Sequence, residues 1–267
     1  MSSIDKPGQF ADVRKHLPFF ASHEGLARLL EDLLCYPQIR KAFEDSAHEE
    51  NPFLGVARRL GLEIRMKGLA ECVPRTGPVV IVANHGFGGA DALALMAVMC
   101  ELRPDFRVLA NREVTLLDAV SAHVFPVTLL NSTSASENVS SLRATLKHIR
   151  KGGALGVFPA GRVAFWKKDR MVDPAWNEHV VKLLQRMDAT IVPLWFYGKP
   201  PAAINFLSRL SGFARTALIP TGLAKMRGRE IVARAGEPIE SDLFRELGSG
   251  GGPWLRKRLE SLADLGN

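Results

Sequence analysis

The spacing of apolar residues changes near residue 63 of the chain. Before that point, apolar residues recur every three to four positions, which predicts helices with a break at Pro37. We expect residues 1–62 to form a helical region, packed on the main core or lying on a membrane surface. Phe19, Phe20 and Arg58-Arg59 stand beside apolar residues and suggest the membrane alternative. The two helical stripes are Leu26, Leu29, Leu30, Leu33 and Leu34, then Phe53, Val56, Ala57 and Leu60.

From Glu63 onward, short apolar segments alternate with helical patterns. The run at 79–83 is continuously apolar, as in a strand that is buried on both faces. This alternation predicts an α/β fold, with a mixed, largely parallel sheet flanked by helices, over residues 63–267. The expected strands are 63–67, 79–83, 106–110, 124–129, 154–158, 191–197 and 230–235.

Helices are expected between these strands. Residues 91–102 are nearly uncharged, which predicts a buried helix. Ser134 opens a capping-box pattern, and Asp173-Pro174 predicts the start of a later helix through a cap and a first-turn proline. Ser241 is expected to cap a terminal helix. The glycine-rich segment 248–253 interrupts that helix, and we interpret it as a flexible surface connector.

Charge and cysteine content narrow the classes of function. The net charge is +7, which favours polyanions: nucleic acid, an anionic membrane or a phosphorylated substrate. No zinc-finger, RNP or basic-zipper pattern is present, so we expect no nucleic-acid partner. The cysteines Cys35, Cys72 and Cys100 have no metal-site or disulfide spacing, so we expect no metal. The sequence has no signal-peptide pattern and no membrane-spanning apolar run, so membrane contact would be peripheral.

Three expected strand ends carry the residues with candidate chemistry. They are Asn84-His85, Asn111-Arg112-Glu113 and the segment 158–162. Because ligands in such sheets bind beyond the carboxyl ends of strands, we expect these turns to face one site. His85 could act as a general base and Asp91 could orient its ring, while arginines bind phosphate. Such a site suits a phosphorylated acceptor with a free hydroxyl.

Plainer interpretations of these residues stay open from the sequence alone. Asp91 could serve only as a helix cap, and His85 could be a structural histidine in a turn. Arg112 could form a surface ion pair with Glu113, and Arg162 could be a solvated loop residue. A Ser-His-Asp hydrolase is disfavoured because the sequence has no Gly-x-Ser-x-Gly elbow.

Four blocks in a fixed order carry a family resemblance. They are Asn84-His85 through Asp91, then 110–113 (Ala-Asn-Arg-Glu), 158–162 (Phe-Pro-Ala-Gly-Arg), and 191–194 (Ile-Val-Pro-Leu) with Gly198 downstream. Between about residues 64 and 239 the chain resembles the glycerolipid acyltransferases of the lysophosphatidic acid acyltransferase-like family. Within that family it is most similar to the hemolysin-type or ornithine-lipid O-acyltransferase branch.

The resemblance implies transfer of a fatty acyl group from acyl-CoA or acyl carrier protein to the hydroxyl of a lysolipid, either lyso-ornithine lipid or a lysophospholipid. His85 would be the general base and Asp91 would hold its tautomer. No cofactor is implied beyond the acyl donor, and the expected location is the cytoplasmic face of the inner or cell membrane, bound peripherally to its anionic surface. The alternative is a non-catalytic lipid-binding protein on the same fold. The implied substrate-binding residues are Arg112, Phe158, Pro159, Gly161, Arg162 and Pro193.

The chain departs from the common family pattern at two places. Five residues separate His85 from Asp91 where the common pattern has four, and positive φ in the Gly88-Gly89 pair could absorb the extra residue. Ala160 stands where the third block usually has glutamate, and Arg162 comes one position early. Both departures point away from the commonest branch of the family.

Overall fold

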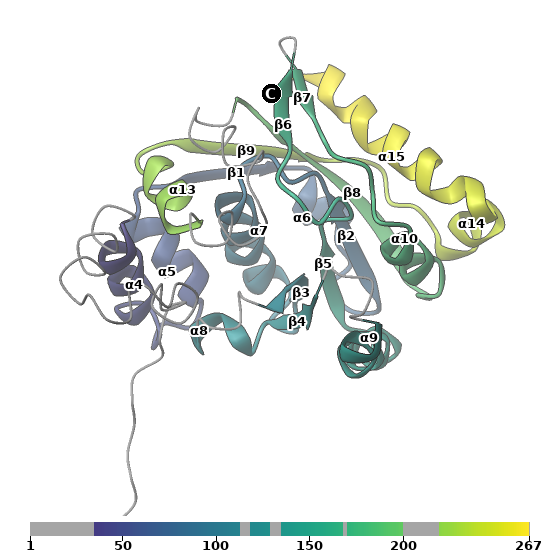
Figure 1. Ribbon diagram of the computed structural model, residues 1–267, viewed down its shortest axis with the longest axis horizontal. Coiled ribbons are helices and arrows are strands. Elements are labelled where there is room, and N and C mark those ends of the chain that lie inside the picture. The colour runs from purple at the N-terminus through teal and green to yellow at the C-terminus, as the bar shows by residue number, and fades with distance from the viewer. Residues whose placement is uncertain (1–34, 113–117, 129–134, 168–169, 200–218, 267) are drawn as a thin grey trace, which may run out of the picture.

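A seven-stranded sheet with helices on both faces forms the framework of the protein (Figure 1). The computed structural model describes residues 35–112, 118–128, 135–167, 170–199 and 219–266. The expected leucine stripe at 26–34, the aromatic pair Phe19-Phe20, the cap at Ser134 and the ion-pair partner Glu113 lie outside these residues. The boundary expected at residue 62 stays a prediction.

The sheet is mixed and largely parallel, as the alternation of strands and helices predicts. Its strand order is β1-β9-β8-β2-β5-β3-β4, and β8 with β9 is the one antiparallel pair among these neighbours. The apolar strand β2 lies between β8 and β5, and all five of its residues are buried. The strands are β1 Glu63–Lys67, β2 Val79–Ala83, β3 Arg107–Asn111, β4 Val124–Val127, β5 Ala154–Val157, β8 Thr190–Tyr197 and β9 Glu230–Ala235.

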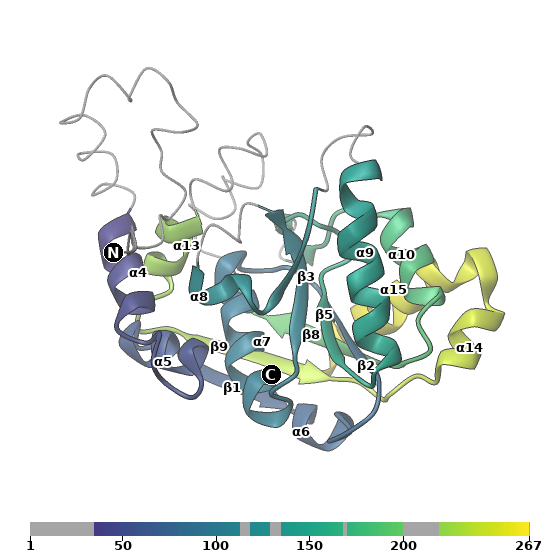
Figure 2. The same cartoon turned by 90° about the horizontal axis from the view of Figure 1, so that it is seen from below.

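The helices form two layers, one on each face of the sheet. Alternate residues of β2 enter different cores: Ile81 packs with the first layer and Val82 with the second. Figures 1 and 2 show the two groups on the two sides of the sheet. The first layer contains α4 Tyr36–Glu44, α5 Pro52–Arg59, α6 Leu69–Cys72, α7 Gly89–Leu102, α8 Asp118–Ser121 and α13 Ile219–Lys225. The second contains α9 Ala135–Arg150, α10 Glu178–Gln185, α14 Ser241–Glu246 and α15 Gly251–Ser261.

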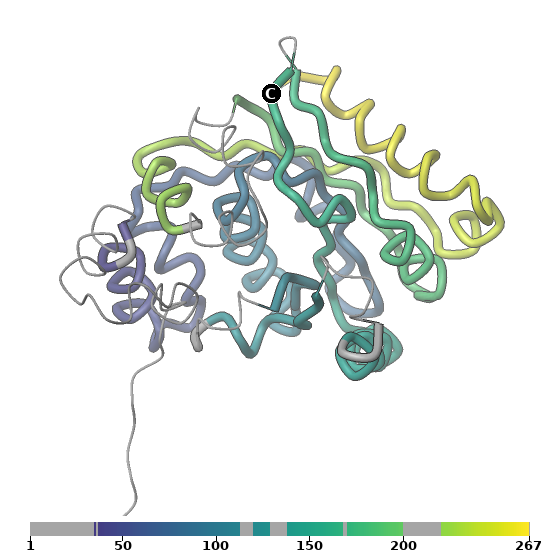
Figure 3. Tube along the Cα trace, in the orientation of Figure 1, coloured from purple at the N-terminus to yellow at the C-terminus, as the bar shows by residue number. Residues whose placement is uncertain are grey.

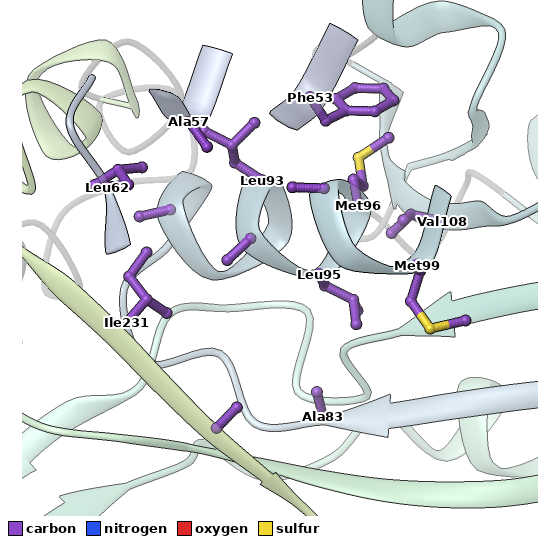
Figure 4. Packing of buried hydrophobic residues seen from close by; sticks show 14 of the residues in the cluster. Phe53, Ala57, Leu62, Ala83, Leu93, Leu95, Met96, Met99, Val108 and Ile231 are labelled. Carbon is purple, nitrogen blue, oxygen red and sulfur yellow. The ribbon is translucent and has the colours of Figure 1, made fainter. Parts of the chain in front are cut away.

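Helix α7 is apolar on nearly every side because it lies between the sheet and α5. Leu93 and Met96 lie toward Ala57 and Phe53 of α5, while Leu95 lies on the side of the sheet (Figure 4). Asn51 caps α5 by accepting from Leu54 N and donates its Nδ2 to Ala97 O of α7 at 2.8 Å. The buried helix expected at 91–102 is therefore confirmed, and it begins two residues earlier. None of the helices in the described segments has the length and apolarity needed to cross a membrane.

Arg103, the C-cap residue of α7, binds the main chain shortly before strands β2 and β5. Its guanidinium is nearly fully buried and donates to the carbonyls of Pro74, Gly77 and Gly152 as well as to both oxygens of Asp105. Burial by itself would raise the pKa of Asp105, but the bonds and charge of Arg103 hold it below its usual value.

Replacing Arg103 with alanine should lower the free energy of unfolding by about 3 kcal/mol, because three carbonyls lose a charged donor. Urea denaturation followed by circular dichroism would measure the change. Arg75→Ala is a matched control, since Arg75 is exposed and should shift the value by less than about 0.5 kcal/mol. Equal stabilities of the two variants would contradict this role for Arg103.

The helix expected to start at Asp173-Pro174 begins later than predicted. Helix α10 starts at Glu178, and its N-cap is Asn177, whose side chain accepts from His179 N at 2.9 Å. The prediction was wrong because the Asp173 carboxylate has other partners, described below. The pattern also missed a two-stranded hairpin, β6 Phe165–Lys167 with β7 Arg170–Val172. Figure 3 follows this hairpin as an excursion of the chain between β5 and α10.

The glycine-rich segment near the carboxyl end is not a free connector. Residues Gly248–Gly250 form a 3-10 turn, and Gly251 and Gly252 open α15 in buried positions. A Cβ on Gly252 would lie 3.0 Å from Val181 of α10, so these glycines let two helices approach closely. Ser241 is not a cap either: Glu240 occupies that position, and Ser241 Oγ donates to Asp188 Oδ1.

Candidate active site

The candidate site lies at the carboxyl edge of the sheet. Strands β8, β2, β5 and β3 are neighbours that run in the same direction, so their carboxyl ends share one edge. Asn84-His85, Phe158 and Arg112 each come directly after one of these strands. The three turns therefore follow strands whose carboxyl ends lie at one edge of the sheet. That they face one common site stays a prediction.

Asn84 fixes the position at which β2 turns toward the site. Its side chain is fully buried and pairs with the main chain of Phe196 in β8: Oδ1 accepts from Phe196 N at 2.7 Å and Nδ2 donates to Phe196 O at 3.1 Å. The Asn84 side chain thus takes the place of a main-chain partner for Phe196, one residue beyond the last pair of β2 and β8. The main chain at this point no longer pairs with β8 and can turn at His85.

His85 and Asp91 form a hydrogen-bonded pair across the glycine-rich turn. His85 Nδ1 lies 2.9 Å from Asp91 Oδ1, and the Asp91 side chain is fully buried. Asp91 also accepts from Phe87 N and Ala92 N, both at 2.8 Å. Two main-chain N–H groups already donate to Asp91, and a carboxylate that also accepts from His85 Nδ1 satisfies all three contacts. The Nε2 atom is then the one that can accept a proton.

The glycines of the turn accommodate its extra residue. Gly88 has φ 66° and serves as the N-cap of α7, whereas Gly89 is the first helical residue and has no positive φ. The expected positive φ is thus confirmed for Gly88 only. At Gly86, a Cβ would lie 2.7 Å from Met171 Cε of β7, so a side chain at this position would displace the end of the Met171 side chain.

The His85 side chain is mostly enclosed but still reachable, with 19% of its surface exposed. The Phe158 ring lies beside it, with 4.5 Å between ring centroids. The main chain of His85 is held from both sides: Ala164 N donates to His85 O at 2.6 Å, and His85 N donates to Asp173 Oδ1 at 3.4 Å. The residues after β5 therefore enclose the histidine.

Two carboxylates set the basicity of His85. Burial alone would lower the pKa of His85, but the charge and hydrogen bond of Asp91, followed by the charge of Asp173, raise it above 6.5. Burial in turn raises the pKa of Asp173 to about 6, even though Trp176 and His85 donate to it.

If His85 is a general base, kcat/KM should fall as the pH drops through the raised pKa of His85, with its acid limb above pH 6.5. The reason is that only the neutral imidazole can take a proton, and a raised pKa keeps it protonated to higher pH. A pH profile at subsaturating substrate would measure the limb. A limb near pH 4 would instead indicate an essential carboxylate that titrates at its ordinary pKa.

The other predicted substrate-binding residues occupy different surroundings. Arg112 follows β3 and Arg162 lies in the turn after β5, and both are exposed. Gly161, directly before Arg162 in that turn, has φ 59°. Pro159 is buried, and its carbonyl accepts from Asn177 N at 2.9 Å. Pro193 lies inside β8 opposite Val82, buried within the sheet and not at its edge. Their roles in binding stay predictions.

Residues that the sequence patterns missed complete the site. Asp173 accepts from Trp176 Nε1 at 3.0 Å in addition to His85 N, and Met171 lies against Asn84 and Gly86. The one available signal was Asn177, which is as good a helix cap as Asp173 and directly precedes α10. Among the described residues, no group of three or more His, Cys, Asp or Glu side chains could hold a metal ion.

Comparison with known proteins agrees with this architecture. The crystal structure of the 1-acyl-sn-glycerophosphate (LPA) acyltransferase PlsC from Thermotoga maritima is similar, with a TM-score of 0.50 over 84% of this chain and 79% of that one. The two sequences are 16% identical, so the likeness concerns the fold. No curated protein matches the chain significantly in sequence. The sequence profile of the Acyltransferase family, however, matches residues 64–197, just over half of the chain and the part that holds His85, Asp91 and the three turns. The chain therefore belongs to the acyltransferase family.

Proposed function

We propose that this protein transfers a fatty acyl group from acyl-CoA or acyl carrier protein to the hydroxyl of a lysolipid. The observation that carries the proposal is the His85–Asp91 pair, joined at 2.9 Å at the carboxyl edge of the sheet. Its geometry presents an imidazole whose outer nitrogen can accept a proton, and the histidine is enclosed yet partly exposed. This is the arrangement that a hydroxyl acceptor requires for activation.

The proposed reaction is a direct displacement. The acceptor hydroxyl gives its proton to His85 Nε2 while its oxygen attacks the thioester carbonyl, forming a tetrahedral intermediate. When that intermediate collapses, the carbon–sulfur bond breaks and the thiolate leaves with the proton from His85 Nε2. Asp91 stabilises the imidazolium that exists between the two transfers. The products are the acylated lipid and the free thiol, and no acyl-enzyme forms.

Exposed cations at this edge support an anionic donor or acceptor. The relevant side chains all belong to segments that follow β3, β5 or β8, and each is exposed. They can attract phosphates of acyl-CoA, acidic groups of acyl carrier protein or an anionic lipid surface. They are Arg112, Arg162, Lys167, Arg170 and Lys199.

The proposed acceptor is lyso-ornithine lipid or a lysophospholipid, and the proposed location is peripheral, on the cytoplasmic face of the inner or cell membrane. The longer turn with Gly88 and the buried Ala160 in the third block support the hemolysin-type or ornithine-lipid branch over the commonest one. Residues 1–62 are proposed as the helical region that contacts the membrane surface, next to an acyltransferase domain at 63–267.

An assay of thiol release tests the function. Purified protein is mixed with acyl-CoA or acyl carrier protein and with each candidate lysolipid in turn, and a thiol reagent reports turnover. Release that depends on one lysolipid, with the acylated lipid identified by mass spectrometry, is the expected result. Lysolipid binding without any thiol release would overturn catalysis and favour the non-catalytic lipid-binding alternative.

A further inference from the structure

Asp173 is a buried carboxylate that the proposed reaction does not use directly. Its side chain is almost fully buried, and both oxygens accept hydrogen bonds: Oδ1 from His85 N at 3.4 Å and Oδ2 from Trp176 Nε1 at 3.0 Å. An amide in this place would point its NH2 group at one of these N–H groups. An ionised carboxylate can accept at both oxygens, so it fits the two contacts.

The surrounding chain holds Asp173 in place through its main chain. Arg256 of α15 donates from Nη2 to Asp173 O at 2.7 Å and from Nη1 to Pro174 O at 3.1 Å. Asn177 N donates to Pro159 O at 2.9 Å, which joins the same segment to the turn after β5. Helix α15 and the turn after β5 thus both hold the segment that carries Asp173 near His85.

We infer that Asp173 is a positioning residue for His85, which anchors the histidine main chain and adds a second negative charge that makes the imidazole a stronger base. The inference rests on the proposed function, in which His85 takes the proton of the acceptor hydroxyl. Asp91 orients the ring through Nδ1, whereas Asp173 acts on the amide nitrogen of the same residue. Two carboxylates from distant parts of the chain therefore position the same histidine, one through its ring and the other through its main chain.

Few charged groups in the described part of the chain act on His85 and Asp173, so the effect of the Asp173 charge on the pKa of His85 can be measured. Among the described residues, the charged groups that act on His85 are Asp91 from α7 and Asp173 after β7. Those that act on Asp173 are His85 and Arg256 from α15. Loss of the Asp173 charge should therefore lower the pKa of His85, since Asp91 alone then opposes the effect of burial.

The variant Asp173→Asn tests the inference, with Glu178→Gln as a matched control. Glu178 lies five positions later and its side chain is 87% exposed, so neutralising it removes an equal charge far from any buried partner. We expect Asp173→Asn to reduce kcat by about tenfold or more and to move the acid limb of the pH profile to lower pH. Glu178→Gln should leave both at their original values.

A second variant separates the loss of the Asp173 charge from the loss of the hydrogen bond that Trp176 Nε1 donates to Asp173. In Asp173→Asn the amide can accept from His85 N, but its NH2 group opposes the Trp176 N–H. The double variant Asp173→Asn with Trp176→Phe removes that conflict and keeps the acceptor for His85. The inference predicts that this double variant keeps the lowered acid limb, whereas Trp176→Phe alone keeps the original limb. A double variant with the activity and limb of Trp176→Phe would overturn the inference.

Titration of the histidine side chains by nitrogen-15 NMR makes the test independent of turnover. The His85 signal is identified by its absence in His85→Ala, and its pKa is compared between the parent protein and Asp173→Asn. A lowered pKa is expected, and an unchanged one would refute the charge effect. If His85→Ala is fully active, the proposed function fails. If it is inactive while Asp173→Asn matches the parent protein, only the role of Asp173 fails.

Discussion

Replacing His85 with alanine should reduce acyl transfer by at least about 10³-fold while the protein stays folded. The acceptor hydroxyl then loses the base that takes its proton, and no other described side chain shares the hydrogen bond to Asp91 Oδ1 that orients such a base. The fold should persist because the substitution removes one ring contact, with Phe158, and one hydrogen bond, with Asp91, from a side chain that is partly exposed. Initial rates of thiol release, with circular dichroism and a thermal melt, would measure both effects.

The matched control for this variant is His179→Ala. His179 is exposed near the start of α10, so its removal changes the same residue type without touching the candidate site. It should retain the activity of the parent protein. Full activity in His85→Ala would refute the mechanism, and a loss of folding in that variant alone would show that His85 has a structural role.

Local patterns in the sequence predict the framework of this fold well. The run at 79–83 predicts strand β2 because five consecutive apolar residues are typical of a strand that is buried on both faces. The nearly uncharged run at 91–102 predicts helix α7 in the same way, since surface helices carry polar residues on one face. In both cases a single segment contains the whole signal.

The errors occur where a distant partner decides between two local solutions. Asp173 and Asn177 are both good helix caps, and what selects Asn177 is that Asp173 accepts from His85, which is 88 positions away. The glycines at 251–252 resemble a flexible linker until α10 is placed against them. No spacing rule within one segment contains this information.

In the candidate site, too, contacts between nearby residues can be predicted from the sequence, whereas contacts between distant segments cannot. His85 and Asp91 are six positions apart on one turn, so their pairing could be predicted from the local sequence. Asn84 with Phe196, and Asp173 with His85, join segments separated by 112 and 88 positions. Those contacts depend on the strand order, which brings β8 beside β2 and places the residues after β5 over the turn.

The variant Asp91→Asn should reduce kcat by about 10²-fold to 10⁴-fold, because the neutral amide no longer stabilises the imidazolium or fixes the tautomer of His85. An amide can accept at one oxygen only, so it leaves either Phe87 N or the pair of His85 Nδ1 and Ala92 N without an acceptor. We therefore also expect the free energy of unfolding to fall by about 1–3 kcal/mol. Initial rates and urea denaturation would measure the two effects.

A double-variant cycle decides whether Asp91 acts through His85 or only supports the first turn of α7, whose N-cap is Gly88. If Asp91 supports catalysis through the histidine, then His85→Ala combined with Asp91→Asn should be no slower than His85→Ala alone, since the carboxylate has nothing left to orient. If Asp91 only accepts from the main chain at the first turn of α7, the two losses should multiply, or Asp91→Asn alone should keep the parent rate and lose stability only. The hydrogen bond between His85 Nδ1 and Asp91 Oδ1 favours the first result, because the same oxygen serves both the ring and the helix amide of Ala92.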